Sequence, residues 1–150
     1  MNKLLIIFLM FIIMACGKKG NADQYFTEGA KCIEQGQNDK AIELYRRGIE
    51  LEPKSAMGYN LLGMAYRFKF NQSGDQEWRK KEIESFEKAI ELAPDFAVAL
   101  VNLGATYYYS GDKGKAVPYF KHALEVYPEH PEAEDIKQMI AEGEEFEKNE

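Results

Sequence analysis

The sequence predicts an all-α protein, a solenoid of three helix pairs followed by a C-terminal capping helix. Three apolar, helix-like runs each end at a proline, and these prolines are Pro53, Pro94 and Pro128. Pro94 and Pro128 are 34 residues apart, and the same interval separates Gly29 from Gly63. Recurrence at a fixed period of roughly 20–50 residues indicates a repeat architecture, in which each unit buries its apolar face against its neighbours.

The second repeat carries an insertion. Pro53 and Pro94 are 41 residues apart, so this repeat is longer than the 34-residue interval found elsewhere. The extra residues lie within the segment FNQSGDQEWRKK. Because Ser and Asp are good N-cap residues, we expect Ser73 or Asp75 to start the second helix early and to lengthen it by about a turn that includes Trp78. Trp78 either packs against the lengthened hairpin or stands exposed as an anchor for a partner.

The repeats carry a recognisable motif. In the third repeat the motif positions are occupied by Leu100, Leu103, Gly104, Tyr107, Ala116, Phe120 and Pro128. This order resembles the tetratricopeptide pattern W-x₂-L-G-x₂-Y, then A-x₃-F, then P. In the first repeat the same positions hold Tyr25, Glu28, Gly29, Cys32, Ala41, Tyr45 and Pro53. In the second repeat they hold Tyr59, Leu62, Gly63, Tyr66, Glu82, Phe86 and Pro94.

The resemblance to the tetratricopeptide family implies a right-handed α-solenoid that binds other proteins. The domain is expected over residues 24–148, with repeats at about 22–55, 56–96 and 97–130 and a capping helix at 131–148. The capping segment places most of its apolar residues on one face of an otherwise charged helix. Those residues are Ala133, Ile136, Met139, Ile140 and Phe146.

The recurring glycines indicate closely packed helices. Gly29, Gly63 and Gly104 are expected in mid-helix, where glycine costs about 1 kcal/mol relative to alanine. Close approach of the second helix of each pair offsets this cost, with Ala41 or Ala116 facing the glycine. The large residues expected to fill the space between successive pairs are Tyr45, Phe86 and Phe120.

The second repeat departs from the pattern at two positions. Phe70 stands where the turn glycine would be, and Glu82 replaces the small residue between the helices. Each repeat-ending proline is expected to stop its helix at the preceding residue. Ser55 or Asp95 is then placed to cap the helix that follows.

The amino terminus differs from the rest of the chain. Lys3 precedes an unbroken apolar run from Leu4 to Ala15, and Cys16 follows. A helix over that run would reach about 18 Å, well short of the ~30 Å hydrocarbon core, so a cleaved secretory signal is favoured over an uncleaved span.

The sequence Ile13-Met14-Ala15-Cys16 resembles the bacterial lipobox, in which the cysteine is acylated and becomes the mature amino terminus. The resemblance implies a lipoprotein signal peptide at residues 1–15 and a lipidated tether at 16–23, with acyl chains such as palmitate on Cys16 holding the protein at the membrane. The alternative is an ordinary signal peptide cut elsewhere. Gly17 follows the cysteine in place of an inner-membrane retention signal, so we expect a bacterial cell-envelope location, at the outer membrane facing the periplasm in an organism with two membranes.

The sequence offers no catalytic or metal site. Phosphate-binding loops, paired-cysteine metal spacing and HExxH-type helices are absent, and no cofactor is expected. His122 and His130 lack a ligand or carboxylate at useful spacing, so solvent-facing or capping roles are expected of them. Cys32 is expected to be a small buried residue. The interspersed charges, 19 basic against 25 acidic, argue against nucleic acid as a partner.

The first helices of the three pairs are expected to line a concave groove that binds a partner protein or peptide. Its residues would be Phe26, Ala30, Ile33, Asn60, Met64, Arg67, Phe68, Val101, Asn102, Ala105, Tyr108 and Tyr109. The alternative is that the amino-terminal segment, the terminal helix or a second copy of the chain covers several of them. Some members of the family hold a peptide's terminal carboxylate with a Lys, Asn and Arg clamp. Here the clamp positions hold Phe26, Ala30, Leu61, Val98 and Asn102, so this recognition is not implied.

Two functions therefore follow from the sequence. The first is a membrane-anchored, non-enzymatic scaffold that acts as adaptor or assembly factor for an envelope complex. The second is an accessory subunit of a transport system that binds a small apolar ligand or forms a homo-oligomer. A closed, ligand-sized cavity would favour the second, and an enzyme is the remote third reading.

Overall fold

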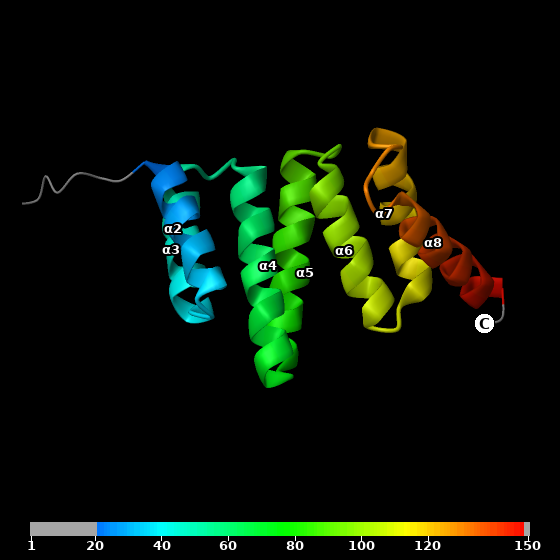
Figure 1. Cartoon of the computed structure of the whole chain (residues 1–150), viewed down its shortest axis with the longest axis horizontal. Helices are drawn as coiled ribbons and strands as arrows, with labels where there is room; N and C mark the ends of the chain where they lie inside the picture. Colours follow the sequence, from blue (N-terminus) through cyan, green and yellow to red (C-terminus); the bar gives the residue numbers. More distant parts are fainter. Residues whose placement is uncertain (1–20, 149–150) are drawn as a thin grey trace, which may run out of the picture.

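A computed structural model describes residues 21–148, and every regular element in that range is an α-helix (Figure 1). The helices are α2 (Ala22–Glu34), α3 (Asn38–Leu51), α4 (Ala56–Ser73), α5 (Gln76–Leu92), α6 (Ala97–Tyr109), α7 (Lys113–Val126) and α8 (Ala133–Lys148). The predicted signal peptide, Cys16 and most of the predicted tether lie outside the described residues.

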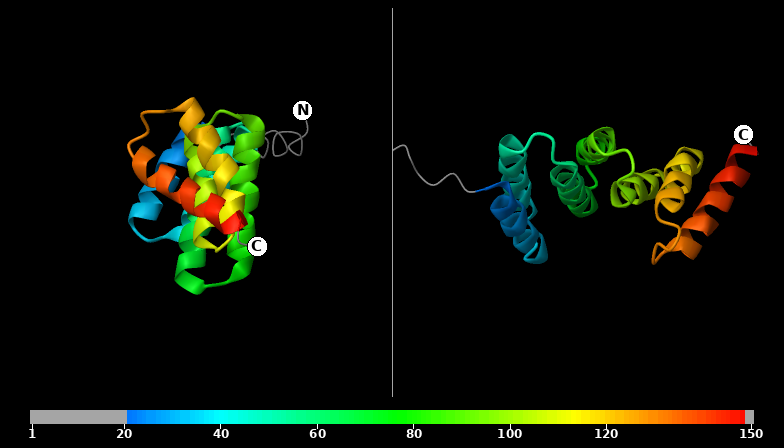
Figure 2. Two further views of the ribbon diagram at one scale, coloured as in Figure 1. Left: turned by 90° about the vertical axis from the view of Figure 1, so that its right-hand side faces the viewer. Right: turned by 90° about the horizontal axis from the view of Figure 1, so that it is seen from above.

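The helices form consecutive antiparallel pairs. Helices α2 and α3, α4 and α5, and α6 and α7 pack against each other, and each pair also contacts the next through α3 with α4 and α5 with α6. Helix α8 packs on α7 at the far end. Seen from above, the pairs follow one another in a row with α8 as the last member (Figure 2). The predicted all-α solenoid of three pairs plus a terminal helix is confirmed.

Side-chain caps start three of the helices. Asn21, Ser55 and Asp75 each accept a hydrogen bond from a backbone N–H in the first turn of α2, α4 and α5. The predictions for Ser55 and Asp75 are therefore confirmed. Asp95 does not cap α6, because Phe96 holds the N-cap position and no side chain bonds to the first turn. The Asp95 carboxylate instead lies 2.9 Å from His122 Nε2.

The second helices end one residue earlier than the prolines predict, and the residue before each proline is the C-cap. Helices α3, α5 and α7 stop at Leu51, Leu92 and Val126, two residues before Pro53, Pro94 and Pro128. The residue preceding each proline is disfavoured in the helical region, which sets the boundary.

The turn inside each pair contains a glycine with positive φ. These are Gly36 at 71°, Gly74 at 69° and Gly111 at 92°. Left-handed backbone is costly for residues that carry a Cβ, so glycine is favoured at each turn. In the second pair, α4 continues through Phe70 and turns four residues later, at Gly74.

The insertion lengthens both helices of the second pair. Helix α4 has 18 residues and α5 has 17, against 13 in α2 and α6 and 14 in α3 and α7. The sequence predicted the longer α5 but not the longer α4. This pair therefore projects beyond its neighbours at the lower edge in Figure 1.

Aromatic rings pack directly on the mid-helix glycines. A Cβ built on Gly29 would lie 2.4 Å from the Tyr45 ring, and one built on Gly63 would lie 2.6 Å from the Phe86 ring. The same contact joins Gly104 to Phe120 at 2.7 Å. These rings thus fill space within each pair, which the sequence did not predict, and Tyr45 also belongs to a cluster with Leu62 and Tyr66 of the next pair. Because glycine has no side chain, the space beside it is free for the ring from the second helix.

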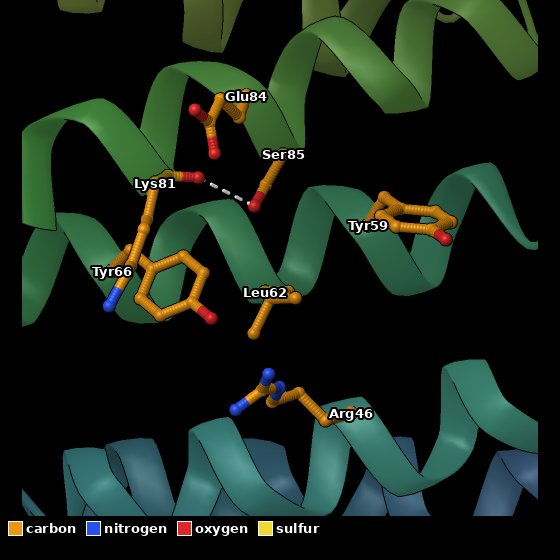
Figure 3. Close-up of a pocket in the computed structure, with 7 residues that line it drawn as sticks. All are labelled: Arg46, Tyr59, Leu62, Tyr66, Lys81, Glu84 and Ser85. Carbon is orange, nitrogen blue, oxygen red and sulfur yellow. Dashed lines mark hydrogen bonds between the residues drawn. The ribbon is translucent and has the colours of Figure 1, made fainter.

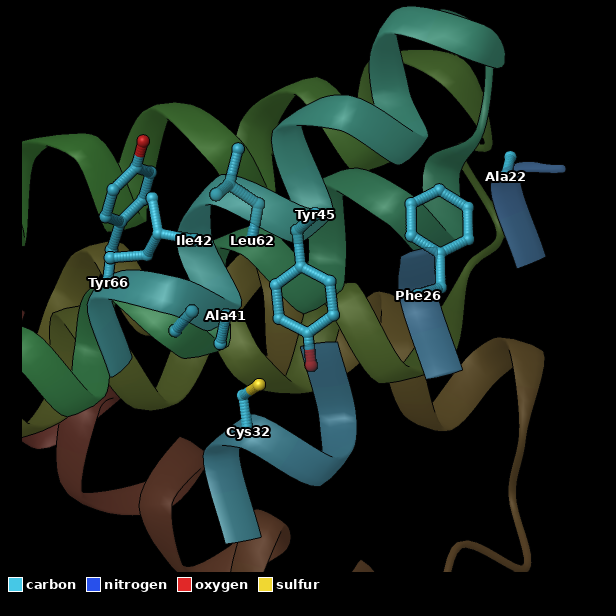
Figure 4. Packing of buried hydrophobic residues seen from close by; sticks show 9 residues of the cluster. Ala22, Phe26, Cys32, Ala41, Ile42, Tyr45, Leu62 and Tyr66 are labelled. Carbon is cyan, nitrogen blue, oxygen red and sulfur yellow. The ribbon is translucent and has the colours of Figure 1, made fainter. Parts of the chain in front are cut away.

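The core of the first pair includes the free thiol. Cys32 is buried beside Tyr45, and Figure 4 shows the sulfur and the tyrosine hydroxyl pointing toward one another. Burial, together with Cys32, raises the pKa of Tyr45 to about 12. The prediction of a buried structural cysteine is confirmed.

Helix α8 covers the open end of the third pair. Ile136 is fully buried, and Met139 and Ile140 pack against the same cluster. The opposite face is charged, as a solenoid end requires. The predicted tether is wrong in its last two residues, since α2 begins at Ala22, which is buried. Among the described helices, none is long and apolar enough to cross a bilayer.

Candidate binding groove

Two large aromatic side chains are exposed near the ends of the first helices. Phe68 on α4 has an exposed fraction of 39%, and Tyr109 on α6 has one of 72%. Met64 lies one turn before Phe68 and is partly exposed. These three residues are members of the predicted groove that remain open to a partner. Aromatic and methionine side chains are enriched in protein interfaces because they offer large contact areas.

Phe26, also predicted in the groove, is part of the core. Its ring lies in a slot between Gly48 of α3 and Gly58 of α4, where a Cβ would approach it to 2.4 and 2.7 Å (Figure 4). The residue is therefore buried between the first and second pairs. The signal that could have located it is the pair of glycines, ten residues apart, on either side of Pro53.

Arg67, a third predicted groove residue, is tied to the neighbouring repeat. Its Nε donates to Glu82 Oε1 at 2.7 Å. Its Nη1 donates to Asn102 Oδ1 at 3.1 Å, and its Nη2 donates to the Asn102 carbonyl at 2.7 Å and to Thr106 Oγ1 at 2.8 Å. The guanidinium thus uses most of its donors inside the protein, and it bridges α4, α5 and α6.

Glu82 is the centre of this network. Its side chain is completely buried, and its two oxygens accept from Arg67, from Thr106 at 2.6 Å and from Arg79 Nη1 at 2.6 Å. Arg79 also lies 3.8 Å from the Phe70 ring centre. A buried carboxylate is tolerated only when charges and donors surround it in this way.

The network extends from Asn102 to Asn60. Asn102 Nδ2 donates to Asn60 Oδ1 at 3.0 Å, which joins α6 to α4. Asn60 is buried, with an exposed fraction of 2%, so its predicted place in an open groove is wrong. Asn102 is half-buried. Together these amides and Arg67 link repeats two and three.

The terminal helix covers part of the third repeat. Val101, Ala105 and Tyr108 pack against the cluster of Ala116, Phe120 and Ile136. The alternative of a groove covered by the terminal helix holds for Tyr108, which contacts α8 directly. Tyr108 donates its hydroxyl to Glu142 Oε2, and Lys113 donates to the same oxygen at 2.7 Å. These donors, with Gln138, lower the pKa of Glu142 to about 2.

Trp78 packs on the lengthened hairpin. It stacks on Tyr66 with ring centres 5.8 Å apart, and the ammonium groups of Lys69 and Lys81 lie 5.5 and 4.5 Å from its ring centre. The tryptophan is half-buried. Of the two readings of Trp78, the structure supports packing.

A cleft lies between α3, α4 and α5 (Figure 3). It has a volume of about 330 Å³ and is lined by Arg46, Tyr59, Leu62, Tyr66, Lys81, Glu84 and Ser85. In Figure 3 the guanidinium of Arg46 points toward α4 and Ser85 donates to the Lys81 carbonyl at 2.7 Å. Its lining combines the charged Arg46, Lys81 and Glu84 with aromatic and aliphatic side chains.

Neither histidine belongs to a reactive cluster. His122 pairs with Asp95 on the surface, and His130 Nδ1 accepts from the Glu132 backbone N–H at 3.1 Å. These are the solvent-facing and capping roles predicted for them. Within residues 21–148, no group of three or more His, Cys, Asp and Glu side chains is placed to hold a metal ion.

Family models match most of the repeats. A TPR repeat model matches residues 29–67, and tetratricopeptide repeat models match residues 74–96 and 97–130. The chain is a tetratricopeptide repeat protein. A comparison with curated protein sequences gave no significant match.

Solved tetratricopeptide structures share the fold of this protein. The first TPR of Spaghetti (RPAP3) bound to the HSP90 peptide SRMEEVD is 22% identical, with a TM-score of 0.68, and the match covers 81% of this chain and 96% of that one. The TPR2B domain of yeast Sti1 in complex with an Hsp70 peptide is 20% identical, with a TM-score of 0.70 and coverage of 83% and 96%. MamA is 30% identical, with a TM-score of 0.62, over 73% of this chain and 60% of its own.

This chain shares the tetratricopeptide fold, but its side chains at the clamp positions differ from those of the carboxylate clamp. Of the five positions that match the carboxylate clamp, only Asn102 bears a hydrogen-bonding side chain, and that side chain is bonded to Asn60 and Arg67. Phe26 is buried and Val98 is an exposed apolar residue. The groove therefore lacks the cationic donors that a terminal carboxylate requires.

Proposed function

We propose that this tetratricopeptide repeat protein is a membrane-anchored scaffold that binds a partner protein or peptide on the first-helix side of repeats two and three. It acts as an adaptor or assembly factor for a bacterial envelope complex, and it is not an enzyme. The observation that carries the binding proposal is the exposure of Phe68 on α4 and Tyr109 on α6, two helices that the bonds among Arg67, Asn60 and Asn102 hold together. A binding surface on rigid, preorganised helices loses less conformational entropy when a partner binds.

The anchoring proposal rests on the sequence Ile13-Met14-Ala15-Cys16 and the apolar run before it. Acyl chains on Cys16 would hold the mature protein at a membrane, since two or more chains suffice for stable anchoring. In an organism with two membranes, we place the protein at the outer one, facing the periplasm. A Cys16→Ser variant is expected to move from the membrane fraction to the soluble fraction. Retention of that variant in the membrane fraction would contradict the anchor.

The exposed chemistry favours an apolar partner segment. Arg67 and Lys69 flank Phe68 in the sequence of α4, and they already pair with Glu82 and Asp39. A carboxylate on a partner would therefore gain little from these cations. Met64, Phe68 and Tyr109 instead offer apolar surface to a hydrophobic helix or extended segment.

A pull-down from native membranes with cross-linking tests the binding proposal. The full-length wild type is compared with a Phe68→Glu, Tyr109→Glu variant, and Phe146→Glu serves as a matched control because Phe146 is exposed to 42% on α8. We expect a protein recovered with the wild type and the control but lost with the double variant. Equal recovery with all three proteins would remove the groove from the proposal.

The transport-accessory alternative requires a closed, ligand-sized cavity. The most apolar of the described cavities, of about 540 Å³, is open to solvent and lies between the inter-repeat loops, lined by Ala56, Met57, Ala93, Pro94, Asp95 and Phe96. An open cleft of this kind does not enclose a small apolar molecule. The scaffold is therefore the function that we propose.

A further inference from the structure

The two edges of the solenoid differ in their exposed side chains. In Figure 1 the beginning of α2 lies at the upper edge, together with the connections from α3 to α4, from α5 to α6 and from α7 to α8. The lower edge carries the turns inside the pairs. The antiparallel pairing of the helices makes this division, since every first helix starts, and every second helix ends, at the edge where the described chain begins.

Five of the eight large apolar side chains that are exposed in residues 21–148 lie at the upper edge. Leu51 and Val126 are the last residues of α3 and α7, and Met57 and Val98 are the second residues of α4 and α6. Tyr127 is the C-cap residue of α7. The apolar cleft between Met57 and Phe96 opens at the same edge. Exposed apolar groups gathered along one edge indicate an interaction surface.

The position of the proposed anchor identifies what meets this edge. Only residues 17–20 separate Cys16 from Asn21, the N-cap of α2. Five residue spacings of fully extended chain reach at most about 18 Å. A lipid anchor on Cys16 therefore keeps the start of α2, at the upper edge, near the bilayer. The turn at the end of α4 lies roughly 24 Å from the start of that helix, at about 1.5 Å per residue.

The charges at this edge select the kind of lipid surface. Glu52, Asp95, Glu129 and Glu132 lie in the inter-repeat connections, where Lys54 is the nearby cation. Anionic lipid attracts basic clusters and not acidic ones. Contact with lipid would therefore depend on the apolar side chains and on Tyr127, whose amphipathic ring suits the headgroup region.

We infer that the inter-repeat edge, formed by Leu51, Met57, Val98, Val126 and Tyr127, rests on a zwitterionic lipid surface. This inference depends on the proposed acyl anchor at Cys16. It orients the solenoid with the lower edge, and with Phe68 and Tyr109 close to it, directed away from the bilayer toward a partner. The apolar edge and the anchor then act together, so that the scaffold stands in one orientation.

Fluorescence quenching on vesicles tests this orientation. The mature protein, residues 16–150, is coupled through Cys16 to a maleimide lipid in phosphatidylcholine vesicles that carry a headgroup quencher. The other thiol, Cys32, is buried and so does not compete for the coupling. A fluorescent non-natural amino acid is placed at position 54 of the upper edge or at position 72 near the lower edge. We expect quenching at position 54 and none at position 72.

Matched variants separate the apolar edge from the tether. The edge variant Met57→Gln, Val98→Gln, Tyr127→Gln is expected to lose the quenching at position 54. The control variant Phe68→Gln, Tyr109→Gln, Phe146→Gln alters three other exposed residues and is expected to keep it. All six side chains are exposed, so circular dichroism should show the wild-type helix content for both variants.

Two outcomes would overturn the inference. Quenching at position 54 that persists in the edge variant would mean that the tether alone determines proximity to the lipid. Equal quenching at positions 54 and 72 would mean that the solenoid has no fixed orientation. Chemical coupling supplies the anchor in this experiment, so its result is separate from the Cys16→Ser test of acylation in cells.

Discussion

Repeats two and three bury the same ring against the same glycine, but they differ at the neighbouring small position. Phe86 packs on Gly63 and Phe120 packs on Gly104 with nearly identical geometry. Where the third repeat has the fully buried Ala116, the second has the fully buried Glu82. The first repeat agrees with the third, since Ala41 occupies the same position.

The side chain at this position need not be apolar, provided that any polar group it buries has hydrogen-bond and charge partners. Glu82 reaches past the helix crossing to Arg67 and Arg79, and Thr106 of the next repeat donates to it. In the third repeat Tyr108 stands four residues after the glycine, where the second repeat has Arg67. The buried charge thus joins repeats two and three through polar contacts, whereas the third repeat meets α8 through a buried apolar cluster and through partly exposed polar pairs such as Lys113 with Glu142.

The largest expected effect comes from moving the carboxylate to the third repeat. Ala116→Glu would bury a carboxylate without an arginine partner, and we expect a loss of at least about 4 kcal/mol of unfolding free energy, enough to prevent folding of that repeat. Urea denaturation followed by circular dichroism measures the loss. Ala116→Ser is the control, since it tests the site without a charge. A stable Ala116→Glu protein would show that the site tolerates charge without the arginine network.

The reverse change in the second repeat is expected to cost less. Glu82→Ala restores the family's small residue but leaves two mostly buried arginines without their carboxylate, so we expect a loss of about 3 kcal/mol. The urea midpoint, compared with that of Glu84→Ala on the exposed face of α5, checks this value. An unchanged midpoint would mean that the network contributes nothing to stability.

The shared glycine contact should cost both repeats a similar, smaller amount. Gly63→Ala and Gly104→Ala each place a Cβ within 2.7 Å of a buried ring, which must shift. Overpacking of this kind costs about 1–3 kcal/mol, and the better helix propensity of alanine returns up to about 1 kcal/mol. Thermal unfolding of the two variants provides the comparison. Stabilisation by either substitution would refute the close packing.

The smallest expected effect concerns the attachment of α8 and depends on pH. The pKa of Glu142 is lowered to about 2 in the folded protein, from an ordinary value of 4.5. The contribution of Glu142 to stability is therefore complete above about pH 5 and is lost as the pH falls toward 2. Glu142→Gln should show a shallower loss of stability over this range than the wild type. The control Glu134→Gln, exposed on the same helix, should follow the wild type, and identical acid profiles for all three would contradict the assignment.

The sequence was sufficient for the architecture because the repeat period is a local and redundant signal. Glycine and proline spacing located every helix pair, and Asp75 and Ser55 were identified as caps from residue type alone. The longer α4 escaped prediction because the pattern placed the turn at residue 70. Helix α4 continues past residue 70, and the chain turns at Gly74, which has a positive φ.

The groove was predicted less well, because its chemistry depends on contacts between repeats. Arg67 reaches partners that are 15 to 39 residues away in sequence, so its local context indicated only a charged groove residue. Phe26 has the periodicity of a groove residue, and only Gly48 and Gly58 on other helices make room for it in the core. Conversely, Phe68 and Tyr109 needed no distant partner, and both are exposed as their positions predicted.

Site-specific photo-cross-linking in native cells tests the proposed scaffold most directly. A photoreactive amino acid is placed at Tyr109, the most exposed of the large apolar residues in the described range, and at Phe146 as the reference position. We expect a discrete cross-linked partner from position 109 that is absent from position 146. Cross-links only to a second copy of the chain, or the same products from both positions, would contradict a groove that binds a partner protein.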